Sequence, residues 1–286
     1  MKSAAHGSSK RPMSVIANGP TVSSIAAATP CAEDVDCGAT ELSPPADASQ
    51  LASAKAKGDR ATARRVLFLV MISATPHDCA GSRPADFSAD GPLVAGVDEA
   101  GRGPLAGPVV AGAVMLCKSP PEGLDDSKKL TARRRAALDE EIRANCAWSV
   151  AVISPAAIDR LNIFAATMLA MSLAVERLEK VLGKPVGQAL IDGNMTPQGR
   201  AAEWRWPARA IVGGDGLEPS IGAASIVAKE WRDRLMIEAA AAFPHYGWER
   251  NKGYGTAEHL HALRTHGATP LHRRSFAPVA QQELPV

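Results

Sequence analysis

Four acidic side chains stand just beyond apolar runs that predict β-strands; they are Asp98, Glu99, Asp192 and Asp215. If these strands end at one edge of a sheet, the carboxylates come together there, and they repel one another unless a cation lies among them. Carboxylate oxygens suit hard cations such as Mg²⁺ and Mn²⁺. Two such ions about 4 Å apart can activate water and stabilise the leaving oxygen of an in-line phosphoryl displacement. The pattern therefore indicates metal-dependent phosphoryl chemistry.

Each acid also has a simpler interpretation, because an acidic residue after a strand often caps a turn or a helix. The metal-site hypothesis gains weight because several acids end strands within one domain. A phosphate-loop nucleotide enzyme is a poorer fit, since no GxxxxGK[ST] or GxGxxG motif follows a strand.

A glycine-rich segment, Gly101-Arg102-Gly103, directly follows the first two acids. Glycine lets a backbone approach a phosphate or a sugar closely, and an arginine can bind a phosphate through two hydrogen bonds. The same three residues could also form a turn between two strands without any ligand. A turn is the commoner explanation, and it is the position beside Asp98 and Glu99 that makes the segment of interest for substrate binding.

Basic residues gather in three places, although the net charge of the chain is only +2. A chain with so little net charge can bind a phosphate backbone only where its basic residues cluster. The alternative explanation of a run of charges on a helix is a solvent-exposed face. We expect Lys229 to lie nearest the acids, because its helix begins soon after Asp215. Such contacts are independent of base sequence and are weakened by salt. The three clusters are Lys128, Lys129 and Arg133 to Arg135; Lys229, Arg232 and Arg234; and His272, Arg273 and Arg274.

Strands and helices mix from residue 93 onward, which predicts an α/β fold with helices packed on a sheet. Two of the apolar runs are joined by a glycine-rich connection and are expected to form adjacent strands. Apolar residues at spacings of three and four predict the longest helix. The expected strands are 93–97, 109–116, 147–153, 189–191 and 208–212; the expected helices are 127–143 with an N-cap at Asp126 or Ser127, 155–182, 221–242 and 256–266.

Residues 1–90 differ in composition from the rest of the chain. They are rich in Ala, Ser, Pro, Gly and Thr without a persistent apolar period, so we predict a mostly disordered extension before a catalytic domain at 91–286. The apolar run 66–72 is too short to span a bilayer, which needs about 20 residues, and lies too far from Met1 for a signal peptide. Met71 is an alternative translation start, in which case the extension is not part of the protein.

Cysteine and histidine usage argues against a structural metal or a disulfide framework. The five cysteines are odd in number and none has CxxC spacing, which fits a reducing, cytoplasmic setting without a membrane partner. Five histidines fall after residue 240, but none has the spacing of a zinc site, so structural or surface roles are expected.

One long block, Val97-Asp-Glu-Ala-Gly-Arg-Gly-Pro-Leu-Ala-Gly-Pro-Val-Val-Ala111, closely resembles the opening motif of bacterial type II ribonucleases H. Four later blocks resemble the same family in the same order, so the resemblance covers residues from about 91 to about 280. These blocks are Asp126-Ser-Lys-Lys-Leu130; Leu190-Ile-Asp-Gly-Asn194; Ala223-Ala-Ser-Ile-Val-Ala-Lys229 with Arg232-Asp233; and Lys252-Gly-Tyr254 followed by His266-Gly-Ala268 and Arg273-Arg-Ser-Phe276.

The resemblance implies a ribonuclease H-like mixed sheet flanked by helices, with a C-terminal helical segment. It also implies that the four acids bind Mn²⁺ or Mg²⁺ and act in catalysis, and that Gly101 to Gly103 read the 2′-hydroxyl of a ribonucleotide. Tyr254 matches a tyrosine that stacks on the sugar at the RNA-to-DNA junction, although a tyrosine between glycines commonly serves packing or a turn. Contact with the 2′-hydroxyl is what separates RNA from DNA at one site.

The implied reaction is hydrolysis of the RNA strand of an RNA–DNA hybrid, and of DNA duplexes 5′ to an embedded ribonucleotide. The products would be a 3′-hydroxyl and a 5′-phosphate, in ribonucleotide removal from DNA and in RNA primer removal. Two other hypotheses stay open: another nuclease or recombinase on a similar sheet, and a nucleic-acid-binding protein without catalysis.

The chain departs from the family pattern around the fourth acid. Gly213-Gly214 stands where the family often has a lysine or another residue before the aspartate. Asp215 is therefore the least secure acid, and Glu218 lies close enough in sequence to share or take its role.

Overall fold

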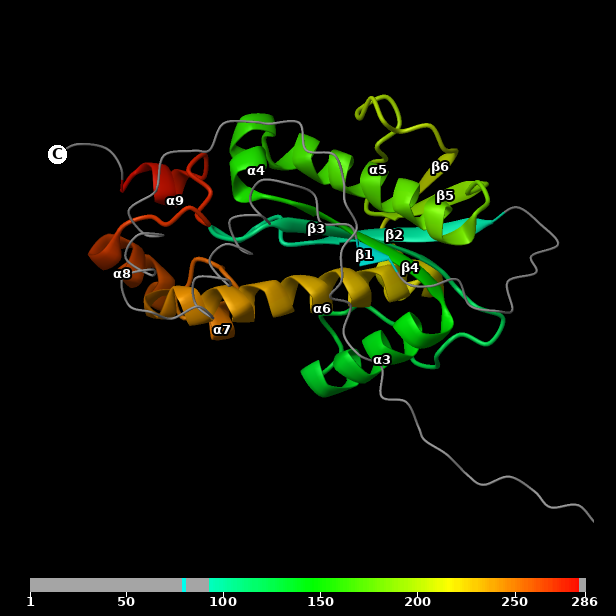
Figure 1. The fold of residues 1–286 in the computed structure, drawn as a ribbon, viewed down its shortest axis with the longest axis horizontal. Coiled ribbons are helices and arrows are strands. Elements are labelled where there is room, and N and C mark those ends of the chain that lie inside the picture. The colour runs from blue at the N-terminus through cyan, green and yellow to red at the C-terminus, as the bar shows by residue number, and fades with distance from the viewer. Residues whose placement is uncertain (1–78, 81–92, 283–286) are drawn as a thin grey trace, which may run out of the picture. The chain divides into compact units, whose positions relative to one another are not determined.

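A mixed β-sheet carries Asp98, Glu99 and Asp192 and is covered by helices on both faces (Figure 1). The computed structural model describes residues 79–80 and 93–282, which belong to one compact unit. The expectations for a disordered extension, for the apolar run 66–72 and for Met71 lie outside the described residues.

Six strands form the sheet in the order β1-β4-β3-β2-β5-β6. The pairs β2–β3, β3–β4 and β1–β4 are antiparallel, whereas β5 and β6 run parallel to β2. The strands are β1 (Cys79–Ala80), β2 (Val94–Ala100), β3 (Val109–Met115), β4 (Ala147–Ile153), β5 (Gln188–Asp192) and β6 (Ala208–Ile211).

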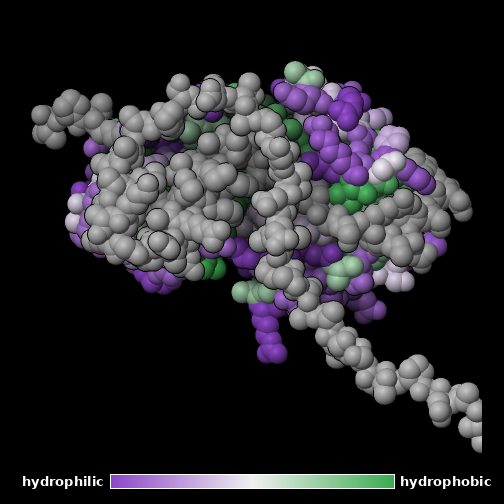
Figure 2. Space-filling view, viewed as in Figure 1, coloured by the Kyte–Doolittle hydropathy of each residue, from purple (hydrophilic) through white to green (hydrophobic). Residues whose placement is uncertain are grey.

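Helices α4 and α5 pack on one face of the sheet, and α3 and α6 pack on the other (Figure 1). Helices α7, α8 and α9 lie near the C-terminal end of α6. On the described part of one face, hydrophilic side chains gather over the end of the sheet that carries β6 (Figure 2). The helices are α3 (Ala132–Asn145), α4 (Pro155–Leu161), α5 (Ile163–Leu182), α6 (Pro219–Ala242), α7 (Trp248–Asn251), α8 (Ala257–His266) and α9 (Ala277–Ala280), with 3₁₀ turns η1 (Gly214–Gly216) and η2 (Pro244–Tyr246).

The predicted α/β class is confirmed, and each of the five expected strands forms within a few residues of its expected bounds. The N-cap of the first expected helix is wrong. Helix α3 begins after Thr131, whose side chain accepts a hydrogen bond from the backbone N–H of Arg134. The hydroxyl of Ser127 instead bonds that of Ser225 at 2.9 Å, so this serine ties a loop to α6 rather than opening a helix.

The long helix expected at 155–182 is two helices bent by 117°. Asn162 separates them with a φ of 68°, and its side-chain oxygen caps α5 by accepting from the N–H of Ala165. Apolar periodicity continues through the bend, because both helices bury their apolar faces, and it therefore could not reveal the break. No single described helix is long and apolar enough to cross a membrane, and only the bent pair α4–α5 meets that test by length and composition.

Two glycines allow α6 to lie unusually close to the sheet. A Cβ atom on Gly96 in β2 would lie 2.1 Å from the backbone carbonyl carbon of Ser220, and one on Gly112 in β3 would lie 2.6 Å from the backbone oxygen of Ala224. Any side chain at either position would push the helix away from the strands. The close contact brings the first turn of α6 to the part of β2 that leads into Asp98.

We therefore expect Gly96→Ala to lower the free energy of unfolding by about 1–3 kcal/mol, the usual cost of overpacking a core. Urea denaturation measures this change. Gly216→Ala is the matched control, because its added methyl would meet only the ends of the exposed side chains of Lys129 and Asp125. Equal stability of Gly96→Ala and the wild type would contradict the close-contact argument.

Candidate active site

Three carboxylates meet where β5 ends beside β2: Asp192 is the last residue of β5, and Asp98 lies within β2 rather than beyond it. The parallel pairing of Val97 with Ile191 sets Asp98 beside Asp192 on the face of the sheet that α6 covers. Asp215 reaches them from the turn η1. Ligand oxygens of the three side chains all lie within 4.8 Å of one another.

Glu99 is the one predicted acid that is not among these three. Successive side chains of a strand point to opposite faces, so Glu99 and Asp98 leave β2 in different directions. The Glu99 carboxylate accepts a hydrogen bond from Arg102 Nη1 at 3.2 Å. Burial raises the pKa of Glu99, Arg102 opposes that rise, and the charge of Asp192 adds to it. Glu99 therefore adjoins the three acids and links them to the glycine-rich loop.

The electrostatics of the cluster are those of a site for a cation. Burial raises the pKa of Asp98 well above its usual value, and the charges of Glu99 and Asp192 raise it further. Burial likewise raises the pKa of Asp215, again with a contribution from Asp192. A divalent ion among these oxygens would remove the repulsion, and the all-oxygen donor set matches Mg²⁺ or Mn²⁺.

Tight packing holds the fourth predicted acid, Asp215, in place. A Cβ on Gly214 would lie 2.6 Å from the Ile221 side chain, and one on Gly222 would lie 2.8 Å from the backbone oxygen of Asp215. The backbone N–H of Asp215 also points at Asp192 Oδ1, at 3.4 Å. Glu218 instead pairs with Arg209 at 3.5 Å and is not in the carboxylate cluster.

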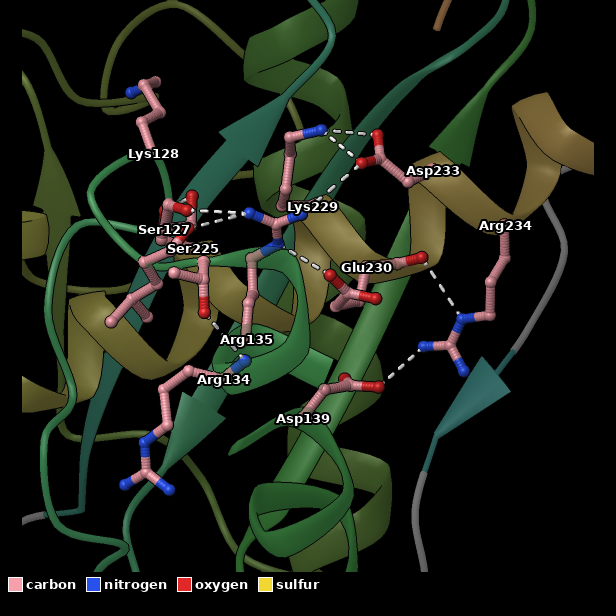
Figure 3. Close-up of polar contacts among 12 residues, drawn as sticks. Ser127, Lys128, Arg134, Arg135, Asp139, Ser225, Lys229, Glu230, Asp233 and Arg234 are labelled. Atoms are coloured by element: carbon pink, nitrogen blue, oxygen red, sulfur yellow. Dashed lines mark hydrogen bonds and ion pairs between the residues drawn. The ribbon is translucent and has the colours of Figure 1, made fainter. Parts of the chain in front are cut away.

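Lys128, rather than Lys229, is the lysine beside the acids. Lys128 Nζ lies 3.9 Å from Asp215 Oδ2 and also 3.9 Å from Asp126 Oδ1. The expectation that Lys229 lies nearest the acids is wrong in its geometry, because Lys229 points at Asp233 on its own helix (Figure 3). The i, i+4 spacing on α6 makes this local pair available, and sequence order could not show it.

A network between α3 and α6 explains how the Lys128 loop is held (Figure 3). Arg135 donates to Glu230 at 2.6 Å and to the backbone oxygen of Ser127 at 3.0 Å. Arg234 pairs with Asp139 at 2.8 Å. The arginines in this network bind protein carboxylates and a carbonyl, whereas the side chain of Lys128 remains 76% exposed.

The glycine-rich loop and Tyr254 lie side by side. A Cβ on Gly103 would be 3.6 Å from Tyr254 Cε1, and the tyrosine ring is 48% exposed. Gly101 has a φ of 93°, and a Cβ there would overlap the Arg232 side chain at 2.0 Å. Arg232 is 1% exposed and donates to the carbonyl oxygens of Pro108 and Lys252. This arginine therefore supports the buried side of the loop. Because it is buried, it cannot contact a substrate phosphate.

Two buried histidines form a hydrogen-bonded chain behind Tyr254. The N–H of Thr269 donates to His272 Nδ1 at 3.0 Å, so the proton of that ring lies on Nε2, which faces His259 Nε2 at 3.1 Å. His259 Nδ1 then donates to the carbonyl of Tyr254 at 2.9 Å. Trp248 Nε1 also donates to His259 Nε2 at 3.1 Å. Both rings are neutral in this arrangement, which confirms the expected structural role of these histidines.

Known proteins that resemble this chain are ribonucleases, which agrees with a carboxylate cluster suited to divalent cations. Residues 95–279 match the family model described as ribonuclease HII. A ribonuclease HII of Erythrobacter litoralis is 66% identical over 75% of this chain and 99% of the relative, and one of Novosphingobium aromaticivorans is 71% identical over 66% of this chain and 97% of the relative. The solved ribonuclease H2 of Pyrococcus horikoshii is 25% identical with a TM-score of 0.55, covering 66% of this chain and 96% of that one.

A ribonuclease H-like sheet with clustered acids at its strand ends defines a metal-dependent nuclease. The chain belongs to the ribonuclease HII family, whose members cleave RNA in RNA–DNA hybrids, and it is an endonuclease of that kind.

The histidine pair predicts a pH dependence of stability. Burial lowers the pKa of His272 from 6.5 to about 3. Between pH 3 and pH 6.5 the His272 side chain binds a proton in the unfolded chain but not in the folded chain. The contribution of His272 to the free energy of unfolding is therefore complete above pH 6.5 and is lost as the pH falls toward 3. We expect the free energy of unfolding of the wild type to fall between pH 7 and pH 5 by about 2 kcal/mol more than that of His272→Gln.

Urea denaturation of the two proteins at each pH measures this difference. Because the raised pKa values of the acids are common to both proteins, their effect cancels. Parallel pH profiles would show that His272 is not buried as a neutral ring.

Proposed function

We propose that the enzyme cuts the phosphodiester bond 5′ to a ribonucleotide, both in RNA–DNA hybrids and at single ribonucleotides within duplex DNA, leaving a 3′-hydroxyl and a 5′-phosphate. The observation that carries the catalytic half is the meeting of Asp98, Asp192 and Asp215 within 4.8 Å. Glu99 joins these three acids, because it lies close enough to Asp192 for the charge of Asp192 to raise the pKa of Glu99.

In this proposal Asp98, Glu99, Asp192 and Asp215 hold two Mg²⁺ or Mn²⁺ ions. Bound ions of this kind would neutralise the acids, activate the attacking water and stabilise the leaving oxygen. The protein's own contribution is rigid placement, since each acid is fixed by a strand or by a glycine-packed turn. Lys128 adds positive charge beside Asp215, where a substrate phosphate would approach.

Ribose recognition falls to the loop Gly101-Arg102-Gly103 and to Tyr254, which adjoin one another next to the acids. An exposed aromatic ring suits stacking on a sugar or base, and glycine backbone suits close contact with a 2′-hydroxyl. Lys229 stays a candidate for contact with the substrate backbone, although its amino group is engaged by Asp233. Cellular roles in ribonucleotide removal and primer removal follow from this specificity.

The test of the reaction is cleavage of a labelled DNA duplex that contains one ribonucleotide, with Mn²⁺, with Mg²⁺ and with chelator. We expect a metal-dependent cut 5′ to the ribonucleotide, and none in an all-DNA duplex. Asp98→Asn and Asp215→Asn should each lower the rate by more than about 100-fold, because each removes a metal ligand. Glu218→Gln should cut at nearly the wild-type rate, because Glu218 faces Arg209.

The alternatives give different results in the same assay. Cutting of the all-DNA duplex would indicate a recombinase-like nuclease. Binding without cutting by a folded protein would indicate a non-catalytic role. An essential Glu218 with a dispensable Asp215 would reverse the assignment of the fourth acid.

Metal binding should be visible without catalysis. Since the metal binds only the folded cluster, Mn²⁺ at 100 times its Kd stabilises the fold by about 2.7 kcal/mol, which raises the thermal midpoint. Asp192→Asn should lose most of this increase. Glu238→Gln, an exposed acid on α6, should keep it. An unchanged increase in Asp192→Asn would exclude the cluster as the metal site.

A further inference from the structure

Arg273 is fully buried against the inner side of the glycine-rich loop. Its Nε donates to the carbonyl of Gly107 at 2.9 Å, and its Nη1 donates to that of Arg102 at 2.9 Å. Its Nη2 donates to the carbonyls of Gly101 at 2.5 Å and Pro108 at 3.1 Å. The guanidinium fork therefore ties the glycine-rich loop to Gly107 and Pro108, the residues just before β3.

This arrangement is costly, because a buried cation loses its hydration. No carboxylate forms an ion pair with Arg273 or with the neighbouring Arg232 among the residues described at 93–282. Burial accordingly lowers the pKa of Arg273 to about 9, which still leaves it protonated at neutral pH. Backbone carbonyls supply the hydrogen-bond partners of this cation, and the Phe276 ring lies 5.1 Å from its guanidinium carbon. The loop conformation and the arginine therefore depend on each other.

The direction of these carbonyls decides where the loop amides point. In a trans peptide the C=O and the N–H point in opposite directions. The carbonyl of Gly101 shares a peptide group with the N–H of Arg102, and the carbonyl of Arg102 shares one with the N–H of Gly103. Because Arg273 draws both carbonyls inward, both N–H groups face outward.

These two amides have no other function within the described protein. Arg102 and Gly103 are exposed, and neither backbone N–H donates to a protein group in the described part of the chain. The side chain of Arg102 bonds Glu99, so the amide pair lies next to the acids. On its other side stands the exposed ring of Tyr254.

We propose that Arg273 is the positioning residue for ribose recognition: it orients the amides of Arg102 and Gly103 as a pair of donors for the 2′-hydroxyl oxygen of the ribonucleotide. The proposal rests on the proposed function, because it concerns how the same site tells RNA from DNA. Arg273 itself never touches the substrate. Its presence in the C-terminal segment makes that segment part of substrate selection.

The test compares binding of two duplexes, one all-DNA and one with a single ribonucleotide, in an Asp98→Asn background that prevents cleavage. Arg273→Lys keeps the charge but loses the planar fork. Loss of two hydrogen bonds to the 2′-hydroxyl should lower the preference for the ribonucleotide duplex by about tenfold or more, with little change in affinity for the all-DNA duplex.

The matched control is Arg177→Lys, because Arg177 is also a buried arginine that donates to a backbone carbonyl, that of Val150. A merely structural effect lowers the active fraction equally for both duplexes and leaves the ratio of affinities unchanged, as we expect for Arg177→Lys. If Arg273→Lys leaves the ratio of affinities for the two duplexes unchanged while Arg273 proteins clearly prefer the ribonucleotide duplex, the positioning role of Arg273 is overturned and the proposed function is not. The proposed function is overturned as well if two results occur together. The Asp98→Asn protein shows no preference for the ribonucleotide duplex, and the protein with all its acids does not cleave that duplex.

A second measurement applies if Arg273→Lys does not fold. In the ¹⁵N-labelled protein, the amide signals of Arg102 and Gly103 should shift on addition of the ribonucleotide duplex and much less with the all-DNA duplex. Equal shifts with both duplexes would overturn the proposal.

Discussion

Repulsion among three clustered carboxylates, two of them buried, is the constraint on which this structure depends. Asp98, Asp192 and Asp215 keep their oxygens within 4.8 Å of one another, at a place where burial and mutual charge raise the pKa values of two of them. Such a cluster persists only where the backbone leaves its side chains no other place. Parallel pairing of β2 with β5 fixes two of the acids, and the close contact of α6 at Gly96 closes the site from one side. The energy held in this cluster is what makes cation binding favourable.

The neighbouring loop is held by a different force. Here the buried charges are arginines, and their partners are carbonyl oxygens rather than carboxylates. Behind Tyr254, a chain of neutral histidines ends on the tyrosine carbonyl. Buried polar networks of this kind impose one conformation when every member is satisfied. The site thus combines an acidic half that needs a cation with a rigid half that presents backbone donors and an aromatic ring.

The basic residues divide between these tasks and the substrate. Arg135 and Arg234 join α3 to α6 through Glu230 and Asp139, which fixes the loop before α3. Lys128 stands at the tip of that loop and remains exposed beside the acids. A chain with a small net charge can therefore present positive charge to a phosphate at one place while other arginines, such as Arg135, Arg234 and Arg273, bind protein groups.

The sequence by itself determined the strands and the family, because strand periodicity is a local property and the matching blocks are contiguous. It placed Asp192 at the end of its strand, whereas Asp98 and Glu99, expected just beyond a strand, lie within β2. It could not place Lys229 away from the acids or show that Arg273 is buried, since both depend on partners brought together by folding. The bend at Asn162 was hidden for a related reason, as both helices it separates bury apolar faces. Only the tertiary structure decided which charges face each other, because a charge next to an acid in space need not be its neighbour in the chain, as Lys128 and Asp215 show.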